Sequence, residues 1–284
     1  MTLSSEELNL LNHQGFIAGP GESESDFKKR VEYCRGLKEE MEELPADEIL
    51  KESHALTRTW FDIAPDWIPC LFSNHQLALW HGGCAWIFQK DDRTPTGAFL
   101  QLRKTFYRNS TFLGIYKRNE FIAHELCHVG RMMFEEPRFE EVLAYQTASS
   151  PLQRIFGPLV RSATEAIIFV ITIMMLLMVD IMILASGYFS IYHQLMWFKL
   201  IPLGLILFAL GRLLNARSTF KKSFNQLEKV LGSPELTRAV IYRLTDQEID
   251  DFAKMSSDEI RSFVEQSKEK ELRWQQIYTY FSRR

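Results

Sequence analysis

The chain has few cysteines and little net charge, and both shortages exclude classes of protein. Its 284 residues include four cysteines, and no two of them form a C-x-x-C pair. This spacing favours free thiols in a reducing compartment over a disulfide framework. The net charge is −3 and the pI is near 6.2, which gives no sign of the excess positive charge that binds nucleic acid. We therefore expect no nucleic-acid partner.

The first residues also lack the features of a secretory signal. Residues 1–7 contain two glutamates and no basic residue, and no apolar core follows them. A signal peptide needs a basic start and an apolar stretch. We therefore expect no such signal here.

A short metal-binding motif is the most informative feature that is present. His124, Glu125 and His128 match H-E-x-x-H, in which both histidines bind zinc and the glutamate is a general base. Residues four apart lie about one turn apart on the same face of a helix, so both imidazoles can reach one ion. Zinc lowers the pKa of its water to about 7, and Glu125 lies close enough to accept the proton. We predict one zinc ion per chain.

A catalytic zinc site needs a third protein ligand and one open position. The sequence offers two neighbouring carboxylates, Glu140 and Glu141, on a helix that can begin at Pro137. Cys127 lies between the two histidines in sequence, and we interpret it as a small buried core residue.

The motif with a glutamate on the next helix resembles the gluzincin group of zinc metallopeptidases. In many of those families, the ligand glutamate is followed three residues later by alanine. Glu141 and Ala144 have this spacing, so the resemblance favours Glu141 over Glu140 as the third ligand. Tyr145 stands where those families often have an aspartate bonded to a zinc-binding histidine. The residue that orients the imidazole is therefore not identified by the resemblance, which covers residues 97–148.

The pattern of the chain predicts an α+β protein in four regions. Short aromatic and β-branched segments at 85–88, 97–105 and 111–116 read as strands before the motif helix, and this order resembles a small zincin-like sheet-plus-helix region. The predicted regions are a helical N-terminal part (1–61), the catalytic part (62–150), a transmembrane hairpin (151–215) and a helical cytoplasmic tail (216–284).

Two apolar segments are long enough to cross a bilayer. Residues 166–187 hold one charge, Asp180, and residues 195–214 hold two, Lys199 and Arg212. Basic residues flank both segments, and the positive-inside rule then puts both termini in the cytoplasm. In an antiparallel hairpin Asp180 and Lys199 lie at nearly the same depth, so we expect them to pair or to reach outward.

These features favour an integral membrane zinc endopeptidase whose active site is cytoplasmic. Its partners would be the lipid bilayer and a protein or peptide substrate, including membrane-associated ones. The strand at 97–105 is the predicted partner of an extended substrate. Candidate transition-state stabilisers are Tyr145, Tyr107 and His81. The alternative is a non-catalytic membrane adaptor with a structural zinc site, although such a site has no need of Glu125 and usually has four protein ligands.

Overall fold

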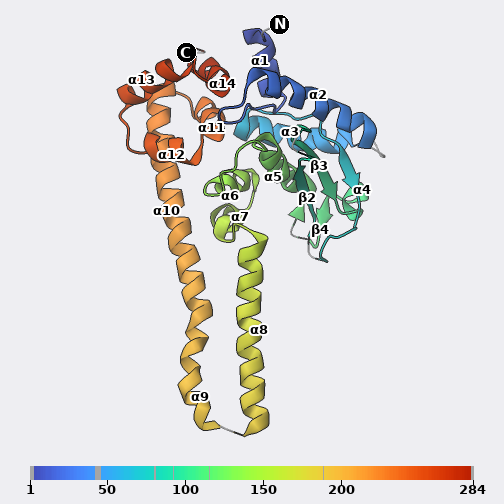
Figure 1. Ribbon diagram of the computed structural model, residues 1–284, viewed down its shortest axis with the longest axis vertical. Coiled ribbons are helices and arrows are strands. Elements are labelled where there is room, and N and C mark those ends of the chain that lie inside the picture. The colour runs from blue at the N-terminus through green and yellow to red at the C-terminus, as the bar shows by residue number, and fades with distance from the viewer. Residues whose placement is uncertain are drawn as a thin grey trace.

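The protein consists of a mostly helical head and a long helical hairpin that projects from it (Figure 1). The computed structural model describes residues 3–41, 46–79, 81–91, 93–114, 116–187 and 189–282. We use "hairpin" for residues 163–211 and "head" for the other described residues. Helices hold 66% of the residues, and the strands form a small mixed sheet, so helix dominates the α+β fold more than the sequence predicts.

The main sheet has three strands, and the strand predicted to pair with a substrate is the central one. The strands are β1 (Cys70–Phe72), β2 (Gly83–Phe88) and β3 (Gly97–Leu102), in the order β1-β3-β2. β3 pairs in parallel with β1 and antiparallel with β2. β3 is thus the central strand, paired with β2 along its whole length and with β1 at Leu100–Leu102, which argues against the prediction that the strand at 97–105 pairs with a substrate. Among the described residues, the strand with an unpaired edge beside the motif helix is β2. β1 was not predicted from the sequence, because it has only three residues and lies in a segment rich in proline and tryptophan.

The third predicted strand, 111–116, is a small ribbon that leads into the motif helix. β4 (Thr111–Phe112) pairs antiparallel with β5 (Tyr116–Lys117), and Ile115 lies outside the described residues. Helix α5 (Arg118–Gly130) follows directly and carries the H-E-x-x-H motif. Its apolar face, which includes Ile122, Leu126 and Val129, is buried in the head. This burial fixes the rotation of α5 and therefore the direction of its polar face.

The N-terminal helices pack against the sheet and α5, and the C-terminal helices pack against α5 and the N-terminal part. The apolar core around Cys127 on α5 takes Ile17 and Phe61 from the N-terminal part and Tyr242 and Tyr280 from the C-terminal part. The C-terminal helices therefore do not form a separate tail but belong to the head. The helices of the head are α1 (Ser5–His13), α2 (Glu24–Met41), α3 (Asp47–Phe61), α4 (Thr105–Arg108), α5, α6 (Glu140–Ala144), α7 (Pro151–Phe156), α11 (Pro234–Tyr242), α12 (Asp246–Phe252), α13 (Ser257–Ser267) and α14 (Leu272–Phe281).

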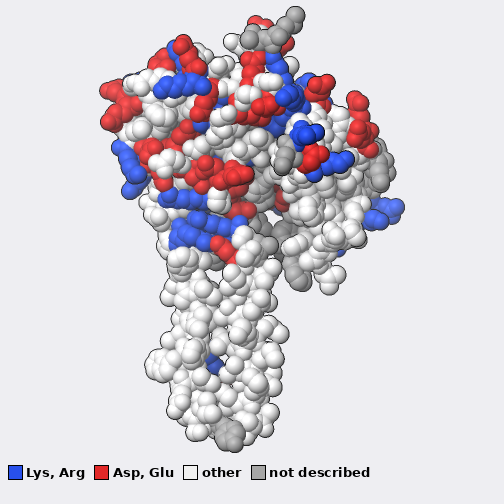
Figure 2. Space-filling model, viewed as in Figure 1, with Lys and Arg blue, Asp and Glu red and all other residues white. Residues whose placement is uncertain are grey.

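Two helices of the hairpin are long and apolar enough to cross a membrane. The candidate spans are Thr164–Ser186 and Phe189–Leu231, and an apolar window of 18 residues within each is only 6% buried within the chain. The first is α8 (Ala163–Ser186); the second joins α9 (Phe189–Leu195), a short 3-10 turn and α10 (Leu200–Leu231). Figure 2 shows a surface almost free of charge along the hairpin.

The hairpin contains one internal ion pair, and α10 joins it to the head. Lys199 Nζ lies 2.9 Å from Asp180 Oδ2, which confirms the predicted pairing of these two charges. At the head end, Arg212 pairs with Glu165 across the two helices. α10 then continues into the head, where Leu227 and Val230 are buried in the same core as Cys127.

Candidate metal centre

Two histidines and one glutamate converge between α5 and α6. His124 and His128 point their Nε2 atoms at each other, 3.3 Å apart. The Glu141 carboxylate lies 3.6 Å from each of these nitrogens, through one oxygen for each. The three ligand atoms all lie within 4.8 Å of one another, and the three side chains are 18–22% exposed. The triad faces a solvent-accessible side of α5 and not the core.

The separations among these atoms suit a tetrahedral zinc ion. Donors at about 2.0–2.2 Å from a tetrahedral zinc lie about 3.3–3.6 Å from one another. The two imidazole nitrogens are 3.3 Å apart, and each lies 3.6 Å from a different oxygen of Glu141, so the carboxylate straddles the pair at a distance close to these values. Three donors leave the fourth position of a tetrahedron open, as a catalytic zinc requires.

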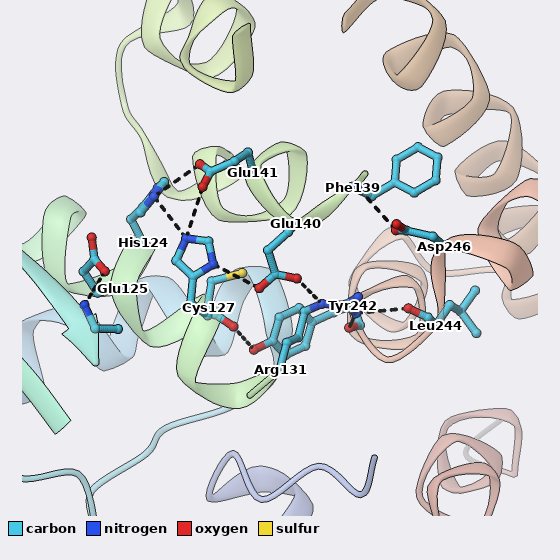
Figure 3. Close-up of polar contacts among 12 residues, drawn as sticks. His124, Glu125, Cys127, Arg131, Phe139, Glu140, Glu141, Tyr242, Leu244 and Asp246 are labelled. Carbon is cyan, nitrogen blue, oxygen red and sulfur yellow. Dashed lines mark hydrogen bonds and ion pairs between the residues drawn. The ribbon is translucent and has the colours of Figure 1, made fainter. Parts of the chain in front are cut away.

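Glu140 has a different position from Glu141, although the two are adjacent in sequence. Its Oε1 lies 3.0 Å from His128 Nδ1. This nitrogen is on the opposite side of the ring from Nε2, the nitrogen that faces His124. The other oxygen of Glu140 accepts a 2.8 Å hydrogen bond from Arg131 Nε. In Figure 3, Glu141 points toward His124, while Glu140 lies on the side of the site nearer Arg131. Glu140 therefore contacts the His128 ring from its Nδ1 side, the position from which an outer partner fixes the orientation of a ligand ring.

Arg131 connects the site to the C-terminal helices, and its role was missed from sequence. Its side chain is fully buried, and its Nη1 donates to the carbonyl oxygens of Tyr242 and Leu244. The Tyr242 hydroxyl in turn donates a 2.7 Å hydrogen bond to the Cys127 carbonyl, within the motif helix. The only sequence signal was an arginine three residues after His128 in an apolar stretch, and it does not reveal a partner more than 100 residues away.

Gly130 makes room for this connection. A Cβ atom at Gly130 would lie 2.2 Å from the Tyr242 hydroxyl oxygen, which is far inside contact distance. The absence of a side chain at the end of α5 therefore allows the close approach of α11 to the motif helix.

The pKa values of the two imidazoles are shifted in opposite directions. Burial opposes protonation of His128, but the hydrogen bond to Glu140 and the charges of Glu140 and Glu141 outweigh burial and raise the pKa of His128 to about 9. Burial and the positive charge of His128 lower the pKa of His124 to about 3. The cluster of carboxylates thus favours a positive charge at the point where the two Nε2 atoms meet.

Glu125 lies beside the triad and contacts the free edge of the sheet. Its Oε2 accepts a 2.7 Å hydrogen bond from the Ala85 amide on β2. Arg103 N donates to Gly82 O, so alternation along an antiparallel ladder turns the polar backbone groups of Gly83, Ala85 and Ile87 away from β3. Burial raises the pKa of Glu125, in the direction that suits a general base.

Two hollows lie on either side of Glu125. One of ≈ 260 Å³ is lined by His124, Glu125, Tyr145 and His81, and the other of ≈ 380 Å³ by Glu125, His128 and Glu140, among others. An extended chain along the free edge of β2 could occupy both hollows and pass Glu125 between them.

The remaining predicted site residues divide into two groups. Tyr145 meets the His124 ring edge-on, with ring centroids 4.6 Å apart, and lines the same hollow as His81. Tyr107 packs against Phe72 instead and lines neither hollow. Cys127 is fully buried in the core and is not a member of the donor cluster found among the described residues, as expected for a core thiol.

Comparisons with protein-family models, curated proteins and solved structures find no match to this chain. The functional argument therefore depends on the geometry of the site itself.

Proposed function

We propose that the protein is a membrane-anchored zinc endopeptidase of the gluzincin type. The observation that carries the proposal is the triangle of His124, His128 and Glu141 donors, with Glu125 beside it at the free edge of a sheet. The 3.3 Å separation of the two imidazole nitrogens supports a shared zinc ion, and the hollows that His124 and His128 line would give water and substrate access to it.

His124, His128 and Glu141 would hold the zinc, which when bound supplies a Lewis acid and lowers the pKa of water. Glu125 would accept a proton from the attacking water and deliver it to the departing amine of the peptide. Glu140 would keep the His128 ring in its ligating orientation, and Arg131 would keep Glu140 ionised. Tyr145 and His81 remain the candidates for a donor to the carbonyl oxygen of the substrate, because both line the hollow beside Glu125.

An extended peptide would add to the sheet at β2. The outward backbone groups of Gly83, Ala85 and Ile87 offer it a ladder of hydrogen bonds, as in other peptide sites that use a sheet edge. The Ala85 amide now bonds to Glu125, so binding of a substrate would exchange this contact for one to the peptide backbone. This exchange would release Glu125 for proton transfer.

The hairpin would span the membrane and hold the head at the cytoplasmic face. Basic residues on both flanks support this orientation, and Figure 2 shows lysine and arginine side chains gathered where the hairpin meets the head. Few residues separate α6, which carries Glu141, from the start of α8, and Figure 1 shows α6 and α7 near the head end of α8. The site would thus favour juxtamembrane segments of membrane proteins. Cysteine labelling of the 186–194 turn from outside, with both termini protected, would support this topology.

The deciding experiment is the Glu125→Gln substitution in the full-length protein. We expect it to keep one zinc per chain and an unchanged unfolding temperature while cleavage of a peptide library disappears. Glu269→Gln, which changes an exposed carboxylate that lines neither hollow, is the control and should leave cleavage intact. If the wild-type protein holds zinc but cleaves no peptide, the adaptor with a structural zinc replaces the enzyme.

A further inference from the structure

A cavity of ≈ 470 Å³ lies behind the metal site, where α10 enters the head. α6 forms one wall of it through Val142 and Leu143, the two residues that follow Glu141. Other walls come from α3, α10 and α11, and most of them are apolar. The lining residues are Trp60, Phe61, Val142, Leu143, Gln146, Leu214, Arg217, Ser218, Phe220, Lys221, Phe224, Arg238 and Ile241.

The charge of this lining has one sign. It contains three basic residues, Arg217, Lys221 and Arg238, and no acidic residue. Arg238 pairs with Glu235, but among the described residues neither Arg217 nor Lys221 has a carboxylate within ion-pair distance. Arg217 Nη1 donates only to the carbonyl oxygens of Arg154 and Ile155, and burial lowers its pKa. Two cations beside an apolar cavity thus lack a negative partner.

The position of the cavity points to the membrane as the source of that partner. Leu214 is the last residue of the predicted second span, and Phe224 lies ten residues further along α10 (224 − 214), about 15 Å higher along the helix. The cavity thus begins at the expected bilayer edge and extends into the head. Trp60, with the guanidinium groups of Arg154 and Arg238 over its ring, matches the aromatic and basic composition of a membrane interface.

We propose that this cavity binds an anionic phospholipid of the adjacent leaflet, with an acyl chain against the apolar walls and the phosphate at Arg217 and Lys221. A soluble anion would satisfy the two cations but not the apolar walls, and a neutral lipid would satisfy the walls but not the cations. The inference rests on the membrane anchoring in the proposed function and is independent of the peptidase chemistry.

The test measures lipid binding to the full-length protein in detergent micelles by native mass spectrometry. Phosphatidylglycerol and phosphatidylcholine are added in turn, and we expect the anionic lipid to bind more tightly. Lys221→Gln should weaken phosphatidylglycerol binding about fivefold, the effect of one basic residue at an anionic surface. Ser218→Trp, which fills the cavity from α10, should weaken it more than tenfold.

Two variants on the same helix are matched controls. Lys222→Gln removes a neighbouring exposed charge and Asn225→Trp adds the same ring to an exposed position, and neither residue lines the cavity. Both should bind the lipid within about twofold of the wild type, and unfolding in detergent should show that all four variants fold. Equal binding of both lipids, or equal losses for Lys221→Gln and Lys222→Gln, would overturn the proposal. Loss of zinc-dependent cleavage in Glu125→Gln bears on the peptidase alone, so the two proposals fail separately.

Discussion

The head and the hairpin handle their charged residues in opposite ways. In the head, Arg131 and Glu140 are held in a network that reaches from the C-terminal helices to His128. In the hairpin, Asp180 pairs with Lys199, which also donates a hydrogen bond to the Tyr192 hydroxyl, and nearly all of the apolar window of each span is exposed. The network in the head draws partners from distant parts of the chain and fixes the atoms around His128, whereas the small cluster in the hairpin offsets the cost of two charges in an apolar setting. We therefore propose that the head carries the chemistry and that the hairpin sets its location.

Excision of the hairpin gives the largest expected effect. Replacement of residues 167–210 by a flexible linker keeps the Glu165–Arg212 pair and the buried part of α10. Zinc content should not change. Cleavage of a peptide fused to a membrane anchor should fall about 100-fold, because tethering on one membrane raises effective concentration by this order. Cleavage of the same peptide free in solution is the control, and an equal loss there would make the hairpin part of the catalytic fold.

Arg131→Met tests the connection inside the head. It removes the partner of Glu140 and leaves the Tyr242 and Leu244 carbonyl oxygens without a donor. We expect zinc affinity to fall about 10- to 100-fold, the usual result of removing an outer partner of a metal ligand. The free energy of unfolding should fall by about 3–5 kcal/mol, since a buried pair is broken.

Arg138→Met is the matched substitution for this measurement. Arg138 also joins the site side of the head to the C-terminal part, through Asp250, but it does not contact Glu140. Its loss should lower stability by a smaller amount and leave zinc affinity unchanged in a chelator competition. If both arginine variants lose zinc equally, the effect of Arg131 is general stability and not the orientation of His128.

The pH dependence of zinc binding has the smallest expected effect. With a pKa of about 9, His128 carries a proton at pH 7 in the metal-free protein. Zinc must displace that proton, so affinity should rise about tenfold for each pH unit between pH 7 and 8 and level off above pH 9. Competition with a chelator of known pH dependence measures this slope. A slope of zero would mean that His128 is neutral before zinc binds.

Sequence reasoning identified the local part of the site and missed the distant part. His124, Glu125 and His128 were chosen from the H-E-x-x-H motif, whose spacing puts both histidines on one face of a helix, and the preference for Glu141 over Glu140 came from a resemblance in spacing. The role of Arg131 depends on backbone carbonyls more than 100 residues away, which no local pattern encodes.

The same limit explains the errors in the fold. The strand at 97–105 was predicted to pair with a substrate, but its central place in the sheet is decided by the pairing with β1, a strand of three residues that the sequence did not reveal. The C-terminal helices were predicted to be a tail because their exposed faces carry many charges. Their buried faces contribute Tyr242 and Tyr280 to the same core as Cys127 of α5, and only the structure shows this long-range contact. The two apolar segments were predicted well because length and hydropathy are local properties.

X-ray absorption at the zinc edge of the purified full-length protein tests the central claim most directly. We predict one zinc per chain with only nitrogen and oxygen neighbours at about 2.0–2.2 Å, and the imidazole scattering of two histidines. His128→Ala should remove the metal, and Glu141→Gln should weaken its binding, while His75→Ala, at an exposed position, should not affect it. A sulfur neighbour at about 2.3 Å, or a protein that retains no zinc after purification without chelators, would contradict the account.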